Sequence, residues 1–520
     1  MRTLSSRLGL AALLGLLSAG VSLGVGELVA ALVRPAAAPI IAVGNRFIRL
    51  TPESVKRWAI RQFGTNDKHV LLTGIYLGVA LLAVLIGWLA LRWLVAGLVG
   101  VGVIGALGSY CALTAPAHHT SDAVPSILGA LAGMAALRML VTALTSQPDP
   151  QAQPGQPRAG TDRRRFLRGG LAAGGLAVFG GVAGRALQHN RFNASAARAA
   201  ITLPEPVPAP GAAGASALTN YDLGKSGVPF LTPASDFYRI DTALAVPQLD
   251  PKSWTLRIHG MVKQEITLTY QQLLARPLVE RWVTLTCVSN EIGGNLIGNA
   301  RFRGVLLADL LKEAGLDARA DQLLATSSDG MTIGSPTAVV TDGRDAMLAV
   351  GMNGQPLPVE HGFPVRMVVP GLYGYVSACK WIVDLEATTF DQHQAYWVQG
   401  GWAAQGPIRL ASRIDRPTNS GSVAVGSQVA VAGVAWDQHV GVSKVEVQVD
   451  NEPWQQARLA PVPSTDTWRQ WVYLWTPSTA GRHQLRVRAY DGNGQPQVAE
   501  RADPFPAGAT GLHTVSVSAR

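Results

Sequence analysis

The sequence predicts a multidomain protein in three parts: an N-terminal α-helical transmembrane bundle, a mixed α/β domain, and a C-terminal β-sandwich. Three observations predict this class. Long, almost uncharged stretches fill the first 145 residues. Short strand-like and helix-like segments alternate through the middle, and strand-like runs separated by Gly, Pro, Asn and Asp close the chain. A chain of 520 residues is also too long for one ordinary core.

The composition narrows the function classes. The formal net charge is +10 at pH 7, but no run of Lys and Arg is interleaved with aromatic residues, so we expect no nucleic-acid partner. Membrane flanks and attraction to an anionic cofactor or substrate explain the positive balance better. The three cysteines, Cys111, Cys287 and Cys379, are too few for a disulfide scaffold.

The first part, residues 1–145, contains four candidate membrane spans, each long enough to cross a bilayer. Their abundant Gly and Ala residues permit close helix packing in lipid. The spans are Leu8–Val33, Val70–Leu91, Trp93–Leu113 and Val124–Leu144. Between the first two, prolines interrupt any long helix, and Val55–Phe63 is a short amphipathic segment. It either lies on the membrane surface or simply connects two spans.

Residues 146–202 begin with a Pro- and Gln-rich linker and continue with the string DRRRFLR at Asp162–Arg168. The apolar run Gly169–Gly184 that follows is a fifth candidate span. The string resembles a twin-arginine export signal, here internal; the alternative is a membrane helix with a positive flank. Export would place everything after Arg185 outside the cytoplasm, attached to the cell membrane. Residues 203–217 are a semi-stiff Pro- and Ala-rich spacer.

The middle domain, expected over residues 218–412, contains a cysteine at a change of pattern. Trp282–Thr286 is β-branched and apolar, as in a buried strand, and a polar, glycine-rich loop follows Cys287. A thiol at a strand end suits a metal ligand or a nucleophile, although a lone cysteine is more often a small buried hydrophobe. Further strands are expected at Trp254–His259, Arg366–Val369 and Trp381–Leu385, and a helix at Leu306–Ala314 that ends at Gly315.

Two long stretches resemble the sulfite oxidase family of molybdenum enzymes, in particular its bacterial membrane-anchored members. They read TCVSNEIGGNLIGNARFRGVLL, around Cys287, and EHGFPVRMVVPGLYGYVSACKWI, over Glu360–Ile382. The resemblance covers roughly residues 220 to 515. It implies one Mo-molybdopterin per chain, with Cys287 as the protein ligand of the metal and the catalytic centre. It also implies two-electron oxygen-atom transfer with a small-molecule substrate.

The resemblance also carries over residues that contact the cofactor. They lie in the strings SDFYRID, SSDG, HGFPVR and SACK, and are Tyr238, Arg239, Asp329, His361, Arg366, Ala378, Cys379 and Lys380. Local chemistry leaves alternatives open. Arg239 could be a surface ion-pair member and Asp329 a turn aspartate. The thiol of Cys379 is expected to pack in the core, with only the backbone of its segment near the pterin.

One departure from the family pattern leaves the substrate open. Sulfite-oxidising members place an arginine and a tyrosine over the oxo face, whereas FYRIDT stands here in place of their arginine element. Arg239 is a candidate substitute for that arginine. Three hypotheses follow: a sulfite-oxidase-like oxidoreductase, a sulfoxide-type reductase fed by an unidentified membrane electron partner, and a non-catalytic membrane-tethered binding protein.

The last part, residues 413–520, is expected to be all-β. Val423–Val434, Val442–Val449, Trp468–Trp475 and His483–Tyr490 are strand-like and separated by turn residues. The pattern fits a β-sandwich of immunoglobulin type. It resembles the dimerisation domain that follows the molybdenum domain in the family, and therefore implies a homodimer.

Overall fold

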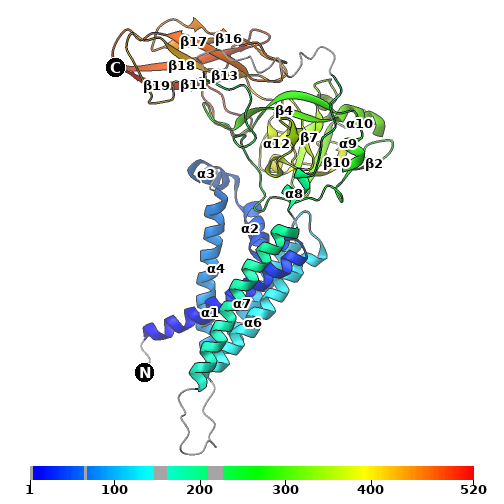
Figure 1. The fold of residues 1–520 in the computed structure, drawn as a ribbon, viewed down its shortest axis with the longest axis vertical. Helices are drawn as coiled ribbons and strands as arrows, with labels where there is room; N and C mark the ends of the chain where they lie inside the picture. Colours follow the sequence, from blue (N-terminus) through cyan, green and yellow to red (C-terminus); the bar gives the residue numbers. More distant parts are fainter. Residues whose placement is uncertain (1–3, 64–66, 146–160, 192, 209–226) are drawn as a thin grey trace, which may run out of the picture. The chain divides into compact units, whose positions relative to one another are not determined.

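The computed structural model describes residues 4–63, 67–145, 161–191, 193–208 and 227–520. The expected linker at 146–160 and residues 209–217 of the expected spacer lie outside the described residues. Two compact units divide the chain. The first takes Met1–Asn193 with Thr242–Pro247, and the second takes Ala194–Asp241 with Gln248–Arg520 (Figure 1).

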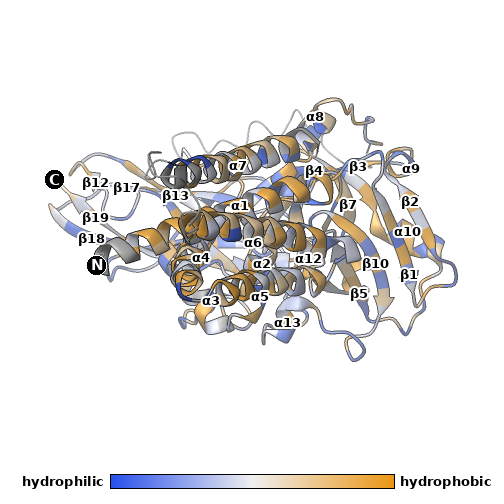
Figure 2. Cartoon of the chain, turned by 90° about the horizontal axis from the view of Figure 1, so that it is seen from below, coloured by the Kyte–Doolittle hydropathy of each residue, from blue (hydrophilic) through white to orange (hydrophobic). Residues whose placement is uncertain are grey.

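Long helices build the first unit. They are α1 (Leu4–Leu32), α4 (Asp67–Arg92), α5 (Leu94–Leu113), α6 (Val124–Thr145) and α7 (Thr161–Arg191). Helix α1 packs along α4, α6 and α7. Within the described residues, five helices are long and apolar enough to cross a membrane. Figure 2 shows the hydrophobic residues that run along α4, α5 and α6. These helices coincide with the five spans expected from the sequence.

Glycine lets α1 and α4 touch backbone to backbone. A Cβ atom on Gly15 would lie 1.8 Å from the carbonyl oxygen of Ala83, and one on Gly87 would lie 2.0 Å from that of Ala11. No larger residue fits at these two crossings without separating the helices. The abundance of glycine in the predicted spans is therefore used for close packing.

Shorter elements connect the long helices. They are η1 (Pro35–Ala37), α2 (Pro39–Leu50), α3 (Glu53–Phe63) and η3 (Thr120–Ala123). Helix α2 begins at Pro39, because proline is tolerated in the first turn of a helix. An ion pair between Arg34 and the buried Asp122 ties the end of α1 to η3.

The α/β part of the second unit contains two sheets. The first has the order β2-β1-β10-β5-β6, and the second has the order β3-β4-β7-β8 with β9 paired to β7. The strands are β1 (Thr255–Gly260), β2 (Ile266–Thr269), β3 (Val279–Thr286), β4 (Ile297–Leu306), β5 (Gln322–Ser327), β6 (Thr332–Pro336), β7 (Met347–Met352), β8 (Gln355–Pro356), β9 (Arg366–Val368) and β10 (Ile382–Thr388).

Short helices connect these strands. They are α8 (Ala194–Ala199), α9 (Tyr270–Leu274), α10 (Leu307–Ala314), α11 (Thr337–Val340), η5 (Val359–His361), α12 (Gly374–Ser377) and α13 (Tyr396–Gln399). Helix α10 ends where the sequence predicts, because Gly315 adopts a left-handed conformation with φ of 69°. Helix α8 also joins this unit: Arg198 donates to the carbonyl oxygens of Pro356 and Leu357. The compact unit therefore starts ahead of the expected residue 218.

The C-terminal part is a sandwich of two sheets, ordered β11-β13-β17-β16 and β12-β19-β18-β14-β15. Its strands are β11 (Ala411–Arg416), β12 (Ser422–Val423), β13 (Val429–Trp436), β14 (Val442–Val449), β15 (Gln455–Gln456), β16 (Arg458–Leu459), β17 (Arg469–Trp475), β18 (Gly481–Asp491) and β19 (Thr514–Ala519). Trp471 and Trp475 point from β17 into a core shared with Val431 and Val447.

One expected strand is wrong in its extent. Val423–Val434 was expected to be continuous, but the chain turns between β12 and β13 and the two strands belong to different sheets. Gly426 has φ of 77° in this turn and donates its amide to the carbonyl oxygen of Pro477. The apolar pattern continued across a turn that only one glycine marked. The fold class as a whole, with helical, mixed and β-sandwich parts, is confirmed.

Candidate active site

Cys287 follows β3 directly and begins the loop that returns as β4. The Cys287 amide donates to the carbonyl oxygen of Leu296 at 2.9 Å, and the side chain of Asn290 accepts from the Leu296 amide at 2.8 Å. These two hydrogen bonds join the start of the loop to its end, just before β4. Burial raises the pKa of the Cys287 thiol, and hydrogen bonds from Ser289 oppose this only in part. A metal would therefore have to hold the sulfur as a thiolate.

Two aromatic residues that precede Cys287 in the sequence, Phe237 and Tyr238, lie in the same region. The rings of Phe237 and Tyr238 stack with centroids 5.3 Å apart, and Phe237 covers Gly298 of β4. Burial and the neighbouring Cys287 raise the pKa of the Tyr238 hydroxyl, whereas Arg366 opposes the shift. Tyr238 therefore lies within electrostatic reach of both Cys287 and Arg366.

The string HGFPVR brings His361 to the same place. The His361 ring lies edge-on to Phe237, with centroids 5.7 Å apart, and its Nε2 is 2.9 Å from the carbonyl oxygen of Ala234. Burial and the positive charge of Arg366 lower the pKa of His361 to about 4. The imidazole is consequently neutral near pH 7, with Nε2 the protonated nitrogen if it donates to Ala234.

Arg366 is a buried cation with spare donors. The residue is 5% exposed, and burial lowers the pKa of its guanidinium to about 10. One terminal nitrogen donates to the carbonyl oxygen of His361 at 3.2 Å, but within the described residues Nε has no hydrogen-bond partner. Gly362 makes this arrangement possible, because a Cβ there would lie 2.9 Å from the Cβ of Arg366 and φ is 109°.

Two buried hydroxyls on neighbouring chain segments have no partner either, among the residues that the structure describes. They belong to Ser327, which pairs with Ile382, and to Ser328, whose amide donates to the carbonyl oxygen of Trp381. The Ile382 amide donates in turn to Val365, the residue before Arg366. A buried guanidinium with an unpaired donor, and unpaired hydroxyls on neighbouring chain segments, fit an anionic group rich in acceptors, such as a pterin phosphate.

Lys380 and Arg239 both bind Asp241, a residue that was not among the predicted cofactor contacts. Asp241, with its side chain 3% exposed, accepts from Lys380 Nζ at 2.8 Å and from Arg239 Nε at 2.9 Å. Burial lowers the pKa of Lys380 to about 8, and the charge of Asp241 opposes this. Asp241 ends the string SDFYRID, which is the only signal that could have pointed to it.

The remaining predicted contacts have local roles as well. Asp329 accepts from the Met331 amide at 3.2 Å, as a turn aspartate would, and the Ala378 amide donates to Gly374. Burial and nearby Asp329 raise the pKa of the Cys379 thiol. That thiol is 1% exposed and packs in the main core of the unit.

The structure thus gathers Cys287, Tyr238, His361, Arg366 and Lys380 in one part of the second unit. Among the described residues, no group of three or more His, Cys, Asp or Glu side chains could hold a metal ion. A metal at Cys287 would therefore need most of its ligands from a cofactor, and the unpaired Nε of Arg366 fits such a group.

Comparison with known proteins gives two family matches. Residues 243–397 match the oxidoreductase molybdopterin binding domain, and residues 411–487 match a bacterial Ig domain. The chain is 30% identical to the sulfite oxidase of Gallus gallus over 315 residues, 51% of this chain and 67% of that protein. It is 28% identical to mitochondrial sulfite oxidase of Homo sapiens over 305 residues, 50% of this chain and 55% of that protein.

The chain covers a larger share of one shorter relative. The chain is 30% identical over 157 residues to the uncharacterized oxidoreductase YuiH of Bacillus subtilis, 30% of this chain and 76% of that protein. The chain spans about half the length of the mammalian sulfite oxidases that it matches. Among solved structures, the sulfane dehydrogenase SoxCD of Paracoccus pantotrophus aligns with a TM-score of 0.48 and 20% identity, covering 61% of this chain and 87% of that one.

Proposed function

Because the chain belongs to the sulfite oxidase family of molybdopterin-dependent oxidoreductases, we propose that it is a membrane-anchored enzyme of oxygen-atom transfer. In this proposal Cys287 ligates a molybdenum held by one molybdopterin. The observation that carries it is that Tyr238 lies within electrostatic reach of both the Cys287 thiol and the buried, incompletely paired Arg366. When bound, the cofactor would supply two-electron redox chemistry.

The side chains around the cofactor would each have a separate role in binding it. Arg366 would bind the phosphate with its planar guanidinium, and the unpaired hydroxyls of Ser327 and Ser328 would add donors. His361 would present its ring in a fixed tautomer because Ala234 binds Nε2. Lys380 would bring positive charge, partly balanced by Asp241.

Membrane anchoring is supported by the five long apolar helices of the first unit. We propose that the second unit lies on the extracytoplasmic side. The support is the string DRRRFLR before the fifth apolar run, which resembles an export signal for folded cargo. A protein that receives its pterin in the cytoplasm must cross already folded, which agrees with such a signal.

The paired state of Arg239 favours a second candidate reaction. Sulfite is an anion, and its recognition would need a cation without a counter-charge. The candidate substitute for the family's arginine is Arg239, which forms an ion pair with Asp241 at 2.9 Å. Because Arg239 shares this one carboxylate with Lys380, its positive charge is partly balanced, and we infer that reduction of a neutral sulfoxide-type substrate, with electrons from a membrane partner, is the alternative to sulfite oxidation.

The metal and pterin content of the purified full-length protein tests the proposal. From a molybdenum-replete host, we expect molybdenum and pterin near one per chain, and Cys287→Ala should lose most of the metal and the activity. Its fold should persist, since replacing a buried thiol by a methyl group costs only about 1 kcal/mol. Circular dichroism in detergent checks the fold.

Three results would each decide something different. Metal near zero in the wild-type protein would support a non-catalytic binding protein and refute the enzyme. Full metal content in Cys287→Ala would refute the ligand assignment. Turnover of sulfite compared with turnover of methionine sulfoxide separates the two candidate reactions.

A further inference from the structure

The strand that delivers Cys287 lies at the edge of its sheet. In the order β3-β4-β7-β8, only one side of β3 is paired within the sheet. On its outer side, the Thr284 amide donates to the carbonyl oxygen of Asp466 at 2.9 Å, and the Thr284 carbonyl oxygen accepts from Gln438 Nε2 at 3.0 Å. Both partners belong to the C-terminal β-sandwich. This domain therefore covers the open edge just ahead of the cysteine.

Gln438 reaches one residue closer to the thiol than this backbone contact. Its Nε2 also donates to Thr286 Oγ1 at 3.2 Å, and Thr286 is the residue before Cys287. Gln438 is 3% exposed, and Thr284 and Thr286 are 0% and 2% exposed. The Trp468 amide donates to Thr284 Oγ1 at 2.7 Å. In such a dry environment each of these hydrogen bonds is costly to break, because no water replaces it.

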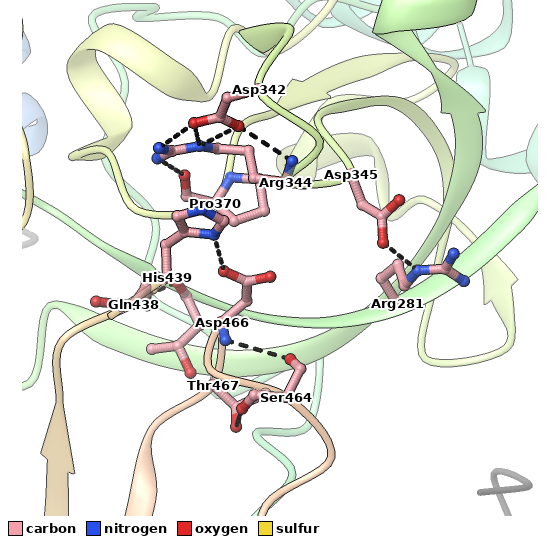
Figure 3. Close-up of polar contacts among 11 residues, drawn as sticks. Arg281, Asp342, Arg344, Asp345, Pro370, Gln438, His439, Ser464, Asp466 and Thr467 are labelled. Atoms are coloured by element: carbon pink, nitrogen blue, oxygen red, sulfur yellow. Dashed lines mark hydrogen bonds and ion pairs between the residues drawn. The ribbon is translucent and has the colours of Figure 1, made fainter. Parts of the chain in front are cut away.

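The loop that carries Gln438 is itself held in place. His439 has φ of 75°, its amide donates to Thr465 at 3.1 Å, and its Nδ1 lies 3.3 Å from Asp466 Oδ1 (Figure 3). Asp466 also supplies the carbonyl that binds Thr284. The two loops of the sandwich that touch β3 are thus tied to each other.

On the α/β side of this contact between the two domains, Arg344 holds its neighbouring loops together. It pairs with Asp342 at 2.6 Å and donates to the carbonyl oxygen of Pro370 at 3.0 Å, as Figure 3 shows. A Cβ on Gly371 would lie 3.3 Å from the Cβ of His439, so the two domains meet here without a gap. The position of Gln438 relative to β3 is consequently set from both sides.

We propose that the C-terminal β-sandwich positions the metal-binding cysteine, and that Gln438 is the residue through which it acts. The inference rests on the proposed function of Cys287 but assigns a new role to this domain. Gln438 would hold the carbonyl of Thr284 and the hydroxyl of Thr286, and so limit the movement of the strand end. A residue of this kind does not touch substrate; it fixes the direction of the sulfur.

The test compares Gln438 with a matched glutamine in the same domain. Gln470 is 1% exposed and also crosses to the α/β part, but it donates to the carbonyl oxygen of Val228 and not to a residue of β3. The variants are Gln438→Ala, Gln438→Met, which keeps the side-chain volume, and Gln470→Ala, each in the full-length protein. Thr286→Val removes the acceptor from the other side of the contact.

Two measurements report on the position of the sulfur. The first is the thiolate-to-metal absorption band of the cofactor-loaded protein. The second is the rate of iodoacetamide labelling of Cys287 in cofactor-free protein, followed by peptide mass spectrometry with buried Cys379 as internal reference. The kcat of the cofactor-loaded protein then shows the effect on turnover. One neutral hydrogen bond corresponds to about a fivefold change in a local opening equilibrium, so both Gln438 variants should label Cys287 about fivefold to tenfold faster. Their absorption band should shift and kcat should fall more than KM changes.

Gln470→Ala should melt at a lower temperature but leave the band and the labelling of Cys287 as in the wild type. Equal effects of Gln470→Ala and Gln438→Ala, or wild-type labelling in both Gln438 variants, would overturn the positioning role. If the wild-type protein binds no metal, the proposed function fails. Labelling would then still show whether Gln438 restrains the strand end.

Discussion

At the scale of single residues, the site is defined by a charge that the protein does not neutralise by itself. Arg366 is 5% exposed and donates to a carbonyl oxygen, and its described contacts include no carboxylate. Its guanidinium also lies over the ring of Phe302 at 5.7 Å, which recovers a little of the lost hydration energy. A buried cation of this kind lowers stability until an anion binds.

We therefore predict opposite effects of Arg366→Met on binding and on stability. Cofactor content should fall at least tenfold, whereas the cofactor-free protein should gain about 1 kcal/mol, because a buried charge is replaced by an apolar chain of similar length. Metal analysis and thermal melting in detergent measure the two quantities. Arg257→Met is the control, since Arg257 forms an exposed pair with Glu265 and should change neither. Wild-type metal content in Arg366→Met would contradict the assignment.

At the scale of elements, the segment before Asp241 packs one aromatic ring, that of Phe237, onto a glycine of β4. Phe237 lies over Gly298, and it contacts Phe302 and His361 with centroids 6.4 and 5.7 Å away. This packing helps to fix the positions of Tyr238 and Arg239, the next two residues of the segment. The absence of a side chain at Gly298 is thus part of the site.

Gly298→Ala should displace this segment. The new Cβ would lie 2.7 Å from the Phe237 ring, which is too close without movement. We expect a loss of about 1–3 kcal/mol of stability and a reduced cofactor content. Adding Phe237→Leu should recover part of the stability, so the two substitutions should be non-additive in thermal melting. Additive effects would show that Phe237 does not rest on Gly298.

At the scale of the whole molecule, the chain forms two units that do not follow the order of the sequence. Thr242–Pro247 belongs with the helices, although it lies between segments of the second unit. Lys68 of α4 donates to the carbonyl oxygen of Ala243 at 2.8 Å, and a Cβ on Gly44 would lie 2.5 Å from Leu244. These contacts fix the six-residue segment to the helical unit.

The full-length chain and the second unit alone should differ in solubility. The full-length chain should stay in the membrane pellet after alkaline carbonate extraction, because five long apolar helices remain in lipid. A chain that begins at Ala194 should appear in the supernatant and melt cooperatively, since that unit has its own cores. Extraction of the full-length chain by carbonate would refute membrane spanning. Aggregation of the shorter chain would show that the second unit depends on the first.

The sequence by itself determined the helices, the three-part architecture and the motif that identifies the family. Apolar runs of span length need no distant partner to be recognised, and HGFPVR carries His361 and Arg366 at a fixed separation. Cys287 was found in the same way, because a strand pattern ends in a glycine-rich loop.

Only the tertiary structure decided what surrounds those residues. Asp241 meets Lys380 across 139 positions, and Gln438 meets Thr284 across 154. The turn between β12 and β13 likewise follows from which sheet each strand joins. Partners so distant in sequence leave no local periodicity, since their choice depends on how sheets and domains pack and on which buried polar groups need a partner.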